Sequence, residues 1–551
     1  MKVFCGALIA CAMLAGSAAR AADAPAGTID ATITIHADRP GATIAPEIYG
    51  QFAEHLGHLM YGGLWVGPKS PIPNVRGFRK DVVEALKRLG VPVVRWPGGC
   101  FADQYHWRDG IGPRDRRPVR INTTWGGVEE TNAVGTHEYM DLVGQLGAKA
   151  YIDTNVGTGS PQETKDWLEY LTSPSHSELA QLRRKNGRDA PWRIDYVGFG
   201  NEPWGCGGDM RPEYYADLYH RFAAFAKTPD DAKPLKLAAG PYDDKTELTE
   251  ALMKTNSFGD MDAITIHHYA LPTGDWSHKG AAIGFPESQW MSTMQAALKM
   301  EDFIRAQTAV MDKYDPDKKV GLDVDEWGNW YDPSPGSNPG FLEQQDSLRD
   351  AITAALNFNI FQAHADRVRM TCIAQVVNVL QALVLTDGPK MVLTPTYWAF
   401  MLYKPFRGAT DLPVDVTSPN YALDGATLSA IHASAARTAA GGLVIALVNI
   451  DPHRAAHIAA TIAGASVAKV SGTIITADTM DAHNTFSRPD VVKPQPFSAA
   501  SVSGGTLQVN LPAKSVVVLQ LQRCFDSSPR ALVALPQSAV AGRRAEGRLP
   551  E

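Results

Sequence analysis

Residues 197–208 read VGFGNEPWGCGG, an apolar run that stops at a glycine, an amide, a carboxylate and a proline. The letters VGF predict a short buried strand, and residues 200–203 predict its end. Glu202 would then stand at the end of a rigid element, which is the support that a catalytic side chain needs. A loop glutamate that makes a salt bridge or caps a helix is the alternative, and this stretch alone does not decide between the two.

The same pattern, an apolar run followed by a helical stretch, recurs along the chain. Helical segments such as FRKDVVEALKRLG (78–90), whose final glycine suits a helix C-cap, separate the runs. The eight candidate strands are TIAPEIYGQF (43–52), VPVVRWPGG (91–99), KAYIDTN (149–155), IDYVGFGNE (194–202), LKLAAGPY (235–242), AITIHHY (263–269), VGLDVDEW (320–327) and RVRMTCIAQVVN (367–378). Eight strand–helix units predict an α/β fold, a (β/α)8 TIM barrel. An open doubly wound sheet is the alternative, but no G-x-G-x-x-G motif follows the first strand.

Past about residue 400 the helical pattern stops. Short alternating runs with Gly, Asn and Asp between them predict a C-terminal antiparallel β-sandwich, and the alternating run TIDATITIHA (28–37) is expected to pair into it. We therefore expect a signal peptide at 1–22, an N-terminal strand of the sandwich within 23–42, the catalytic barrel at 43–400, the sandwich at 401–523 and a disordered tail at 524–551.

Composition narrows the function classes. The chain has 551 residues, of which 44% are hydrophobic and 20% are charged, as in ordinary globular proteins. The formal net charge of −7 is mild and argues against general nucleic-acid binding, which needs a basic face. No P-loop, nucleophile elbow or zinc-ligand spacing is present in the sequence, so we expect neither a metal nor a cofactor.

The N-terminus predicts export. Lys2 is followed by an uncharged run up to residue 19 and by Ala-Arg-Ala at 19–21, which has the form of a signal-peptide cleavage site. We expect the mature chain to begin near Ala22 and to be periplasmic or secreted, with no membrane attachment after cleavage. A single anchoring helix and a lipoprotein signal, suggested by LIAC at 8–11, are the alternatives.

Of the six cysteines, Cys5 and Cys11 would leave with the signal peptide. The remaining four lie far apart and show no CxxC or Cys/His spacing; they are Cys100, Cys206, Cys372 and Cys524. Export would permit a disulfide, but nothing in the spacing specifies one.

In such barrels the side chains at the carboxyl ends of the strands converge on one mouth. The polar residues expected there are Glu54, His55, Arg95, Cys100, Asp153, Asn155, Asn201, Glu202, His267, His268, Tyr269, Asp325, Glu326, Gln375 and Asn378. Two glutamates across one mouth are the equipment of glycoside hydrolysis, in which one acid is protonated and the other is ionised. We expect His267 and His268 to be structural.

Five blocks in order now point to a family: RWPGGCFADQYHWRDGIGPRDRRP (95–118), GFGNEPWGCGG (198–208), DEWGNWY (325–331), AQVVNVLQALV (374–384) and TPTYWAFMLY (394–403). Together they resemble the α-L-arabinofuranosidases of glycoside hydrolase family 51, over nearly all of the chain to about residue 522. The resemblance implies a (β/α)8 barrel with a jelly-roll sandwich. It also implies exo-acting, retaining release of terminal non-reducing α-L-arabinofuranosyl residues from arabinose-containing hemicellulose or pectin fragments. Family members commonly form hexamers, so a homo-oligomer is expected.

The resemblance also assigns roles. Glu202 resembles the general acid/base, Glu326 the nucleophile, Asn201 the amide that binds the sugar 2-hydroxyl, Tyr269 the nucleophile's orienting tyrosine, Glu54 a ligand of arabinose hydroxyls, Arg95, Cys100 and Gln375 wall residues, and Trp330 an aromatic on the aglycone side. Because Cys100 would face the sugar, we expect its thiol to be unpaired. Without the resemblance, Arg95 could simply pair with a barrel carboxylate, and Cys100 and Trp330 could be packing residues.

Two other functions remain open. A related retaining hydrolase that acts on xylosides or β-glucans would share the two glutamates and differ in the sugar pocket. A non-catalytic carbohydrate-binding protein would use the sandwich and the aromatics, but it would not need both acids.

Overall fold

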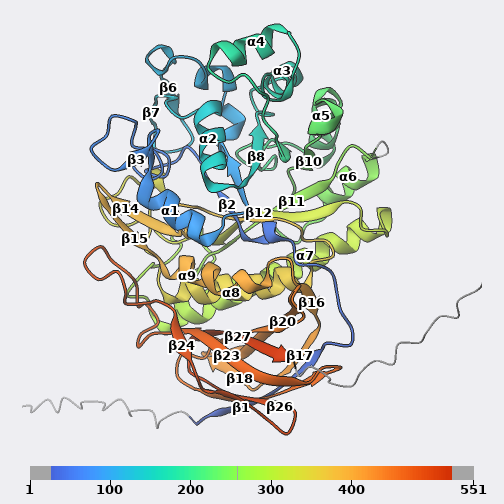
Figure 1. Ribbon diagram of the computed structural model, residues 1–551, viewed down its shortest axis with the longest axis vertical. Coiled ribbons are helices and arrows are strands. Elements are labelled where there is room, and N and C mark those ends of the chain that lie inside the picture. Colours follow the sequence, from blue (N-terminus) through green and yellow to red (C-terminus); the bar gives the residue numbers. More distant parts are fainter. Residues whose placement is uncertain (1–26, 257–258, 524–551) are drawn as a thin grey trace, which may run out of the picture.

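A computed structural model describes residues 27–256 and 259–523. Eight parallel strands close into a barrel, each hydrogen-bonded to the next along the chain and the last to the first (Figure 1). They are β2 (Gly50–Phe52), β5 (Val93–Trp96), β8 (Lys149–Thr154), β9 (Tyr196–Phe199), β10 (Leu235–Ala238), β11 (Ala263–Ala270), β12 (Gly321–Asn329) and β13 (Thr371–Ile373). Each predicted run overlaps one of these strands, and β11 and β12 extend past theirs by one and two residues, so the barrel prediction is confirmed.

The first predicted run forms less strand than expected. Residues Pro46–Tyr49 make a 3-10 turn, and only Gly50–Phe52 join the barrel. Proline accounts for the difference, because its ring fixes φ near the helical value and it has no N–H to lose at the first position of a helical turn.

Helices cover the outside of the barrel. They are α1 (Lys80–Leu89), α2 (Thr136–Leu146), α3 (Pro161–Thr172), α4 (Glu178–Lys185), α5 (Pro212–Phe225), α6 (Glu247–Thr255), α7 (Glu287–Tyr314), α8 (Leu348–Ala363) and α9 (Pro395–Leu402). Helix α1 ends as predicted, because Gly90 adopts a left-handed φ of 70° and its N–H bonds to the carbonyl of Leu86.

The sandwich lies below the barrel in Figure 1 and has two sheets. The five-stranded sheet has the order β17 (Val414–Thr417), β1 (Ile29–His36), β22 (Ala456–Ala463), β26 (Thr506–Leu511) and β25 (Ala500–Ser503). The six-stranded sheet has the order β16 (Thr410–Leu412), β20 (Ile431–Arg437), β21 (Leu443–Asn449), β27 (Ser515–Arg523), β23 (Val467–Ile475) and β24 (Gln495–Phe497). The N-terminal strand joins the sandwich as predicted, although its pairing with β22 is parallel in an otherwise antiparallel sheet.

Four two-stranded hairpins decorate this frame. They are β3–β4 (Asn74–Val75, Phe78–Arg79), β6–β7 (Arg120–Asn122, Val128–Glu130), β14–β15 (Val384–Asp387, Lys390–Leu393) and β18–β19 (Asn420–Leu423, Ala426–Ser429). The β6–β7 hairpin follows barrel strand β5 along the chain and carries a tryptophan into the site described below.

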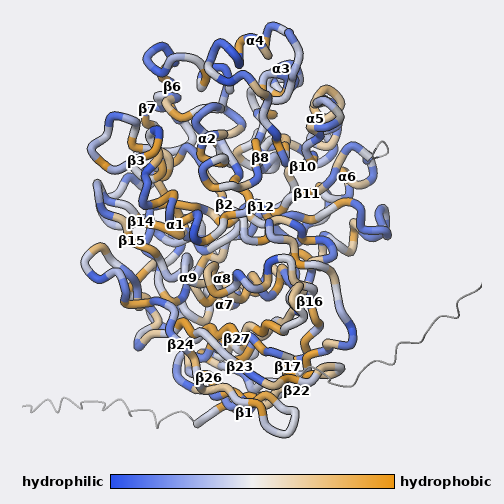
Figure 2. The backbone as a smooth tube through the Cα atoms, in the orientation of Figure 1, coloured by the Kyte–Doolittle hydropathy of each residue, from blue (hydrophilic) through white to orange (hydrophobic). Residues whose placement is uncertain are grey.

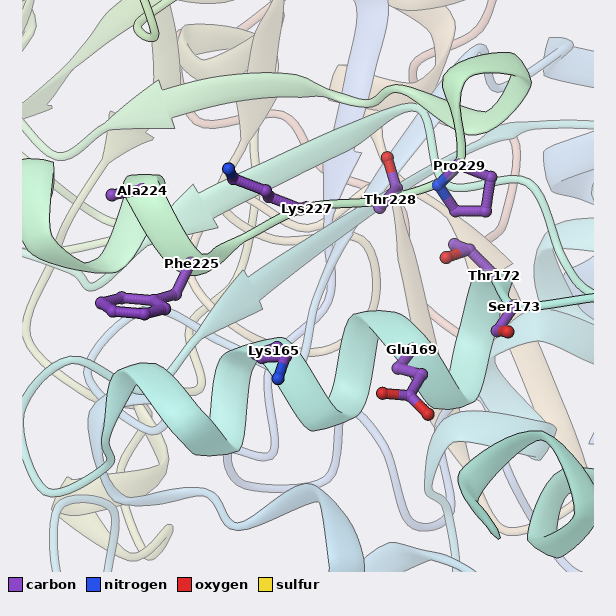
Figure 3. A pocket seen from close by; sticks show the side chains of 9 residues that line it. All are labelled: Lys165, Glu169, Thr172, Ser173, Ala224, Phe225, Lys227, Thr228 and Pro229. Atoms are coloured by element: carbon purple, nitrogen blue, oxygen red, sulfur yellow. The ribbon is translucent and has the colours of Figure 1, made fainter. Parts of the chain in front are cut away.

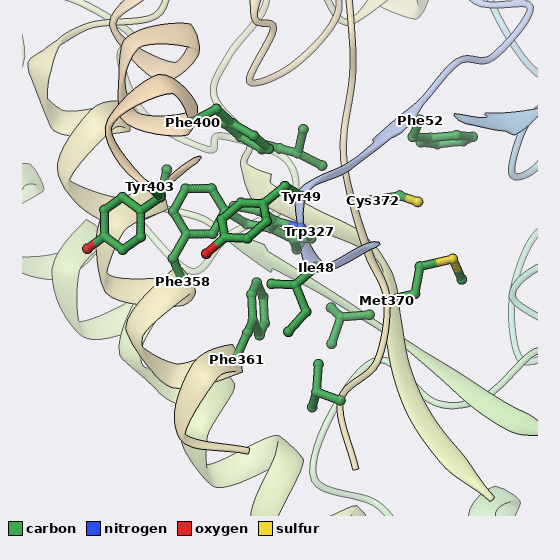
Figure 4. Close-up of a cluster of buried hydrophobic side chains, with 14 of the residues drawn as sticks. Ile48, Tyr49, Phe52, Trp327, Phe358, Phe361, Met370, Cys372, Phe400 and Tyr403 are labelled. Atoms are coloured by element: carbon green, nitrogen blue, oxygen red, sulfur yellow. The ribbon is translucent and has the colours of Figure 1, made fainter. Parts of the chain in front are cut away.

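Helix α8 joins the two halves. It packs on β12 of the barrel and on β20, β21 and β27 of the sandwich, and every residue from Leu348 to Gln362 is buried. A helix buried on all sides is expected at the centre of a large protein. Figure 2 shows hydrophobic segments along α8 and the sheet beneath it, and Figure 4 shows the ring of Phe358 among Tyr49, Trp327, Phe400 and Tyr403.

Within the described ranges, no helix combines the length and the apolar character that crossing a bilayer requires. The predicted signal peptide, its cleavage near Ala22, the alternative lipoprotein signal and the predicted tail all lie outside the described residues.

We predict that Phe358→Ala lowers the free energy of unfolding by about 3–5 kcal/mol, the cost of removing a large core ring and leaving a cavity. Chemical denaturation monitored by intrinsic fluorescence measures it. The control is Phe225→Ala, whose ring is 53% exposed and should change stability by no more than about 0.5 kcal/mol. Equal stability of the two variants would show that α8 does not join the barrel and sandwich as described.

Candidate active site

All nine predicted site residues converge at the carboxyl end of the barrel. A pocket there is lined by Glu54, Leu56, Cys100, Trp125, Glu202, Tyr269, Glu326, Trp330, Leu342, Gln375 and Leu380. Arg95 and Asn201 lie directly behind this lining and are hydrogen-bonded to each other, Nη2 to Oδ1, at 2.8 Å. The structure therefore brings together in one place side chains from strand ends that are up to 321 residues apart.

Arg95 is the hub of the site. Its side chain is 1% exposed and donates to Glu326 Oε1 at 2.8 Å and to Asp153 Oδ2 at 2.7 Å, while its Nε lies 3.3 Å from Asp325 Oδ2. A buried guanidinium is stable only when acceptors of opposite charge surround it. Arg95 therefore does pair with barrel carboxylates, as the alternative interpretation expected. It also contacts Asn201, the amide predicted to bind the sugar.

A break in the sheet register lets two neighbouring acids share the barrel interior. Between β11 and β12 the paired residues change from Thr265↔Asp323 to His267↔Glu326. Over this step β11 advances by two residues and β12 by three, so β12 contains one extra residue, a β-bulge. Successive strand residues normally point to opposite faces, and a bulge of this kind re-aims them. As a result both Asp325 and Glu326 reach Arg95.

Glu326 is held by two donors on different oxygens. Arg95 donates to Oε1, and the hydroxyl of Tyr269 donates to Oε2 at 2.7 Å. A cation and a phenol that both donate to one carboxylate fix its orientation. The predicted contact between Tyr269 and this glutamate is present.

Glu202 sits at the end of β9 in a left-handed conformation, with φ at 42°. Burial and the nearby Glu326 carboxylate raise its pKa, against the opposing effect of the His267 imidazole. A carboxyl group with a raised pKa keeps its proton more readily and suits proton donation at neutral pH.

His267 was predicted to be structural, and the structure adds that its ring contacts two acids of the site. Its Nδ1 lies 2.9 Å from Glu202 Oε1 and its Nε2 lies 3.1 Å from Asp325 Oδ1. Burial disfavours the charged ring, but the carboxylates of Glu326, Asp325 and Glu202 outweigh it and raise the pKa of His267 to about 10. The ring is therefore protonated at neutral pH and donates to both acids. The only signal in the sequence was its position at a strand end.

His268 behaves as predicted. Its Nε2 lies 2.7 Å from the backbone carbonyl of Ala296 on α7, outside the barrel. Burial lowers its pKa to about 4, so this ring is neutral.

Glu54 lines the same pocket as the two acids. Its Oε1 accepts the backbone N–H of Gly99 and Phe101 and the indole N–H of Trp125, and its Oε2 accepts the side-chain amide of Gln375. Burial and the charge of Glu326 raise the pKa of Glu54 to about 7. Sequence reasoning missed Trp125, because it arrives on the β6–β7 hairpin rather than on a strand end.

Glycine 99 is required by this crowding. A Cβ at Gly99 would lie 2.3 Å from Glu326 Oε1, which no side chain can tolerate. The backbone of the WPGG motif therefore packs directly against the Glu326 carboxylate.

The prediction that the Cys100 thiol is unpaired was wrong. Cys100 lines the pocket, but it is bonded to Cys206 rather than free, with a Cα–Cα distance of 5.6 Å. The loops after β5 and β9 meet at the barrel mouth, so two cysteines 106 residues apart come within disulfide range. Sγ of Cys206 lies 3.3 Å from Glu202 Oε2, so the disulfide packs against the acid.

Among residues 27–256 and 259–523, two groups bring possible metal-binding atoms within 4.8 Å of one another. One contains the Cys100–Cys206 disulfide, whose sulfurs are not thiolates. The other is Glu202, His267 and Glu326, where a protonated imidazole has no free lone pair for a metal. Neither set suits a metal, and the absence of a cofactor stays a prediction.

A separate hollow of about 380 Å³ lies on the outer barrel surface between α3 and the end of α5 (Figure 3). It is lined by Lys165, Glu169, Thr172, Ser173, Ala224, Phe225, Lys227, Thr228 and Pro229. It contains one carboxylate and lies away from the strand ends, so it lacks the paired acids of the barrel mouth.

The comparisons with known proteins agree with this geometry. The family model described as Alpha-L-arabinofuranosidase 1 domain matches residues 85–282, and Alpha-L-arabinofuranosidase C-terminal domain matches residues 325–515. A protein of Bacteroides ovatus, named as an intracellular exo-alpha-L-arabinofuranosidase, is 46% identical over 94% of this chain and 99% of its own.

Two solved structures extend the likeness to three dimensions. The GH51 arabinofuranosidase from Xanthomonas axonopodis pv. citri is 51% identical with a TM-score of 0.88. The alpha-L-arabinofuranosidase from Thermotoga maritima in its arabinose complex is 28% identical with a TM-score of 0.78. In both comparisons the matched region covers 90% of this chain and 100% of the solved chain.

The predicted periplasmic or secreted location is wrong by the same comparison, since the Bacteroides ovatus relative is named as intracellular. That prediction depended on the composition of residues 1–22 alone. An uncharged run followed by small residues has the composition of a signal peptide without demonstrating export.

This chain covers 99% of the Bacteroides ovatus relative and 100% of the Xanthomonas structure, whose fold it shares. The chain belongs to the α-L-arabinofuranosidases of glycoside hydrolase family 51.

Proposed function

We propose that this chain releases terminal non-reducing α-L-arabinofuranosyl residues from arabinose-containing hemicellulose or pectin fragments, with retention of configuration. Glu202 is the general acid/base and Glu326 is the nucleophile. The closeness of the two acids carries the proposal: one carboxylate oxygen of each lies within 4.8 Å of the other. Retaining glycosidases place their carboxyl groups about 5–5.5 Å apart, whereas inverting ones leave about 6.5–9.5 Å for a water.

The hydrogen bonds of Glu326 and Glu202 support the assignment of Glu326 as the nucleophile and Glu202 as the general acid/base. Glu326 has both oxygens held by donors, one of them the buried cation Arg95, as an ionised nucleophile requires. Glu202 has a raised pKa and one oxygen bonded to His267, which leaves Oε2 to carry the proton toward the leaving group.

The reaction then has two displacements. Glu326 attacks the anomeric carbon, the bond to the leaving oxygen breaks, and Glu202 gives its proton to that oxygen. The product is an arabinosyl ester of Glu326. Ionised Glu202 next takes a proton from water, the water oxygen bonds to the same carbon, and the ester breaks to regenerate the Glu326 carboxylate. Two inversions give net retention.

Asn201 is placed to bind the sugar 2-hydroxyl. Arg95 can only donate, so the Asn201 atom that faces it is the oxygen, and the amide nitrogen points the other way. The neighbours of that nitrogen are the disulfide sulfurs at 3.5 and 3.8 Å, which are weak acceptors. The amide N–H groups therefore remain available for a hydroxyl, whose hydrogen bond strengthens in the transition state.

The remaining wall residues suit a small furanose. Glu54 and Gln375 offer oxygen and amide groups to ring hydroxyls, and Cys100 contributes the disulfide surface. Trp330 lies edge-on to Tyr269 and to the exposed Trp276, with ring centroids 4.9 and 5.2 Å away, and can receive the aglycone. The expected homo-oligomer, a hexamer by resemblance, stays a prediction that light scattering can test.

Sugar selectivity gives the first test. We expect hydrolysis of 4-nitrophenyl α-L-arabinofuranoside to exceed that of the β-D-xyloside by at least about 100-fold in kcat/KM, because buried polar groups of the pocket would be left unpaired by the wrong sugar. Release of nitrophenolate measures both. Preference for the xyloside would favour the related hydrolase, and no turnover of either would favour a binding protein.

The two glutamates predict different kinetics. Glu326→Ala should abolish turnover for every leaving group. Glu202→Ala should slow unactivated arabinosides by about 10²–10⁴-fold while the first step on activated ones survives, and added azide should restore turnover as an arabinosyl azide of α configuration. Glu169→Ala, on the outer surface of α3, is the control. Its activity should match that of the natural enzyme on both substrate classes, and azide should not change it. Azide rescue of the Glu326 variant alone would reverse the assignment.

His267 predicts a pH effect. Its positive charge lowers the pKa of Glu202, so His267→Gln should raise that pKa further. The acid then keeps its proton to higher pH, and the alkaline limb of kcat/KM should move upward. His268→Gln, whose ring faces Ala296, should leave that limb in place. A downward or absent shift for the His267 variant would show that its charge does not act on the acid.

A further inference from the structure

Asp103 lies within the first family block but has no role in the chemistry described so far. Its side chain is buried, with 5% of the residue exposed, in the loop that follows β5. Oδ1 accepts the backbone N–H of Val156 at 2.8 Å and of Gly157 at 2.7 Å, and Oδ2 accepts the backbone N–H of Asn201 at 2.8 Å. One carboxylate therefore ties together the loops that follow β5, β8 and β9.

Three glycines close around this carboxylate. A Cβ at Gly157 would lie 2.8 Å from Cβ of Asp103, one at Gly200 would lie 3.4 Å from Oδ1, and one at Gly207 would lie 3.0 Å from Oδ2. Gly200 and Gly207 stand on either side of the turn that carries Asn201 and Glu202. The backbone can settle onto Asp103 because no side chains intervene.

That turn needs to be held. Glu202 has a φ of 42°, a region that side-chain-bearing residues seldom occupy and that persists only where the surroundings impose it. The residue before it, Asn201, has its N–H bonded to Asp103. The carbonyl of Glu202 accepts the N–H of Gly205 and of Gly207, which closes the turn on its other side.

We propose that Asp103 is a positioning residue for the reaction: it fixes the left-handed turn so that Asn201 and Glu202 meet the sugar and the leaving oxygen together. The inference rests on the proposed role of Glu202 as general acid/base. Asp103 does not line the sugar pocket, so it acts through the backbone rather than on the substrate.

Asp103→Asn separates positioning from folding. The variant keeps the shape, but it has one oxygen for three N–H donors, so its NH2 must face a backbone N–H and push that strand end away. Displacement of the acid should cost about 10- to 100-fold in kcat/KM for unactivated arabinosides and less than about 3-fold for activated ones. Azide should accelerate the variant on activated substrates, as it does Glu202→Ala, while leaving the natural enzyme unchanged.

Asp323→Asn is the matched control. Asp323 is a buried aspartate that also accepts backbone N–H groups, those of Arg369 and Met370, at the opposite end of the barrel strands. Its variant should lower the thermal midpoint and keep the natural ratio between the two substrate classes. Asp103→Ala, which removes the carboxylate without adding a donor, is the second variant and should show the same substrate pattern as Asp103→Asn.

The outcomes are distinct. A selective loss on unactivated substrates with azide rescue in either Asp103 variant supports the proposal. An equal loss on both classes, a change in thermal midpoint alone, or failure of both variants to fold while Asp323→Asn folds would overturn it. Glu202→Ala in the same panel keeps the two questions apart: if it shows no selective loss, the proposed function fails, and if only it does, the role of Asp103 fails.

Discussion

The buried guanidinium of Arg95 is the constraint on which the site depends. It stands in the barrel mouth beside three acids, Asp153, Asp325 and Glu326, and its charge opposes the effect of burial on the pKa of Asp153 and of Asp325. The same side chain holds the oxygen of Asn201, so it positions both Glu326 and the Asn201 amide. Loss of this one cation would therefore disturb charge balance and geometry together.

A second cation completes the balance on the acid side. His267 lies between Glu202 and Asp325, and Arg95 with His267 holds the pKa of Asp325 well below its usual range despite burial. Asp325 thus stays ionised and keeps His267 charged, while burial keeps the pKa of Glu202 raised. The two acids lie a few ångströms apart in different surroundings, because Glu326 accepts from two donors and Glu202 is mainly desolvated; the proposed roles require such a difference.

Apolar runs and helical segments were enough to predict the barrel, because each strand is a local pattern bounded by turns. Glu202 and Glu326 could be singled out because the runs IDYVGFGNE and VGLDVDEW place them near strand ends within ordered family blocks, although β12 continues past Glu326 to Asn329. What could not be predicted depends on contacts across the barrel. The Cys100–Cys206 bond joins loops 106 residues apart, and the bulge that turns both Asp325 and Glu326 inward arises from register rather than composition. The role of His267 follows only once Glu202 and Asp325 are seen on either side of it.

The central claim is that Glu326 forms a bond to the sugar. An activated 2-fluoro-arabinofuranoside slows both steps, because fluorine at C2 disfavours the cationic transition state, and its good leaving group lets the first step proceed. Acid quenching during turnover, digestion and peptide mass spectrometry would then locate the attached sugar. The account predicts a single fluoro-arabinosyl group on Glu326 and none on the Glu326→Ala protein. Attachment to Glu202, or the absence of any covalent species while product is released, would contradict it.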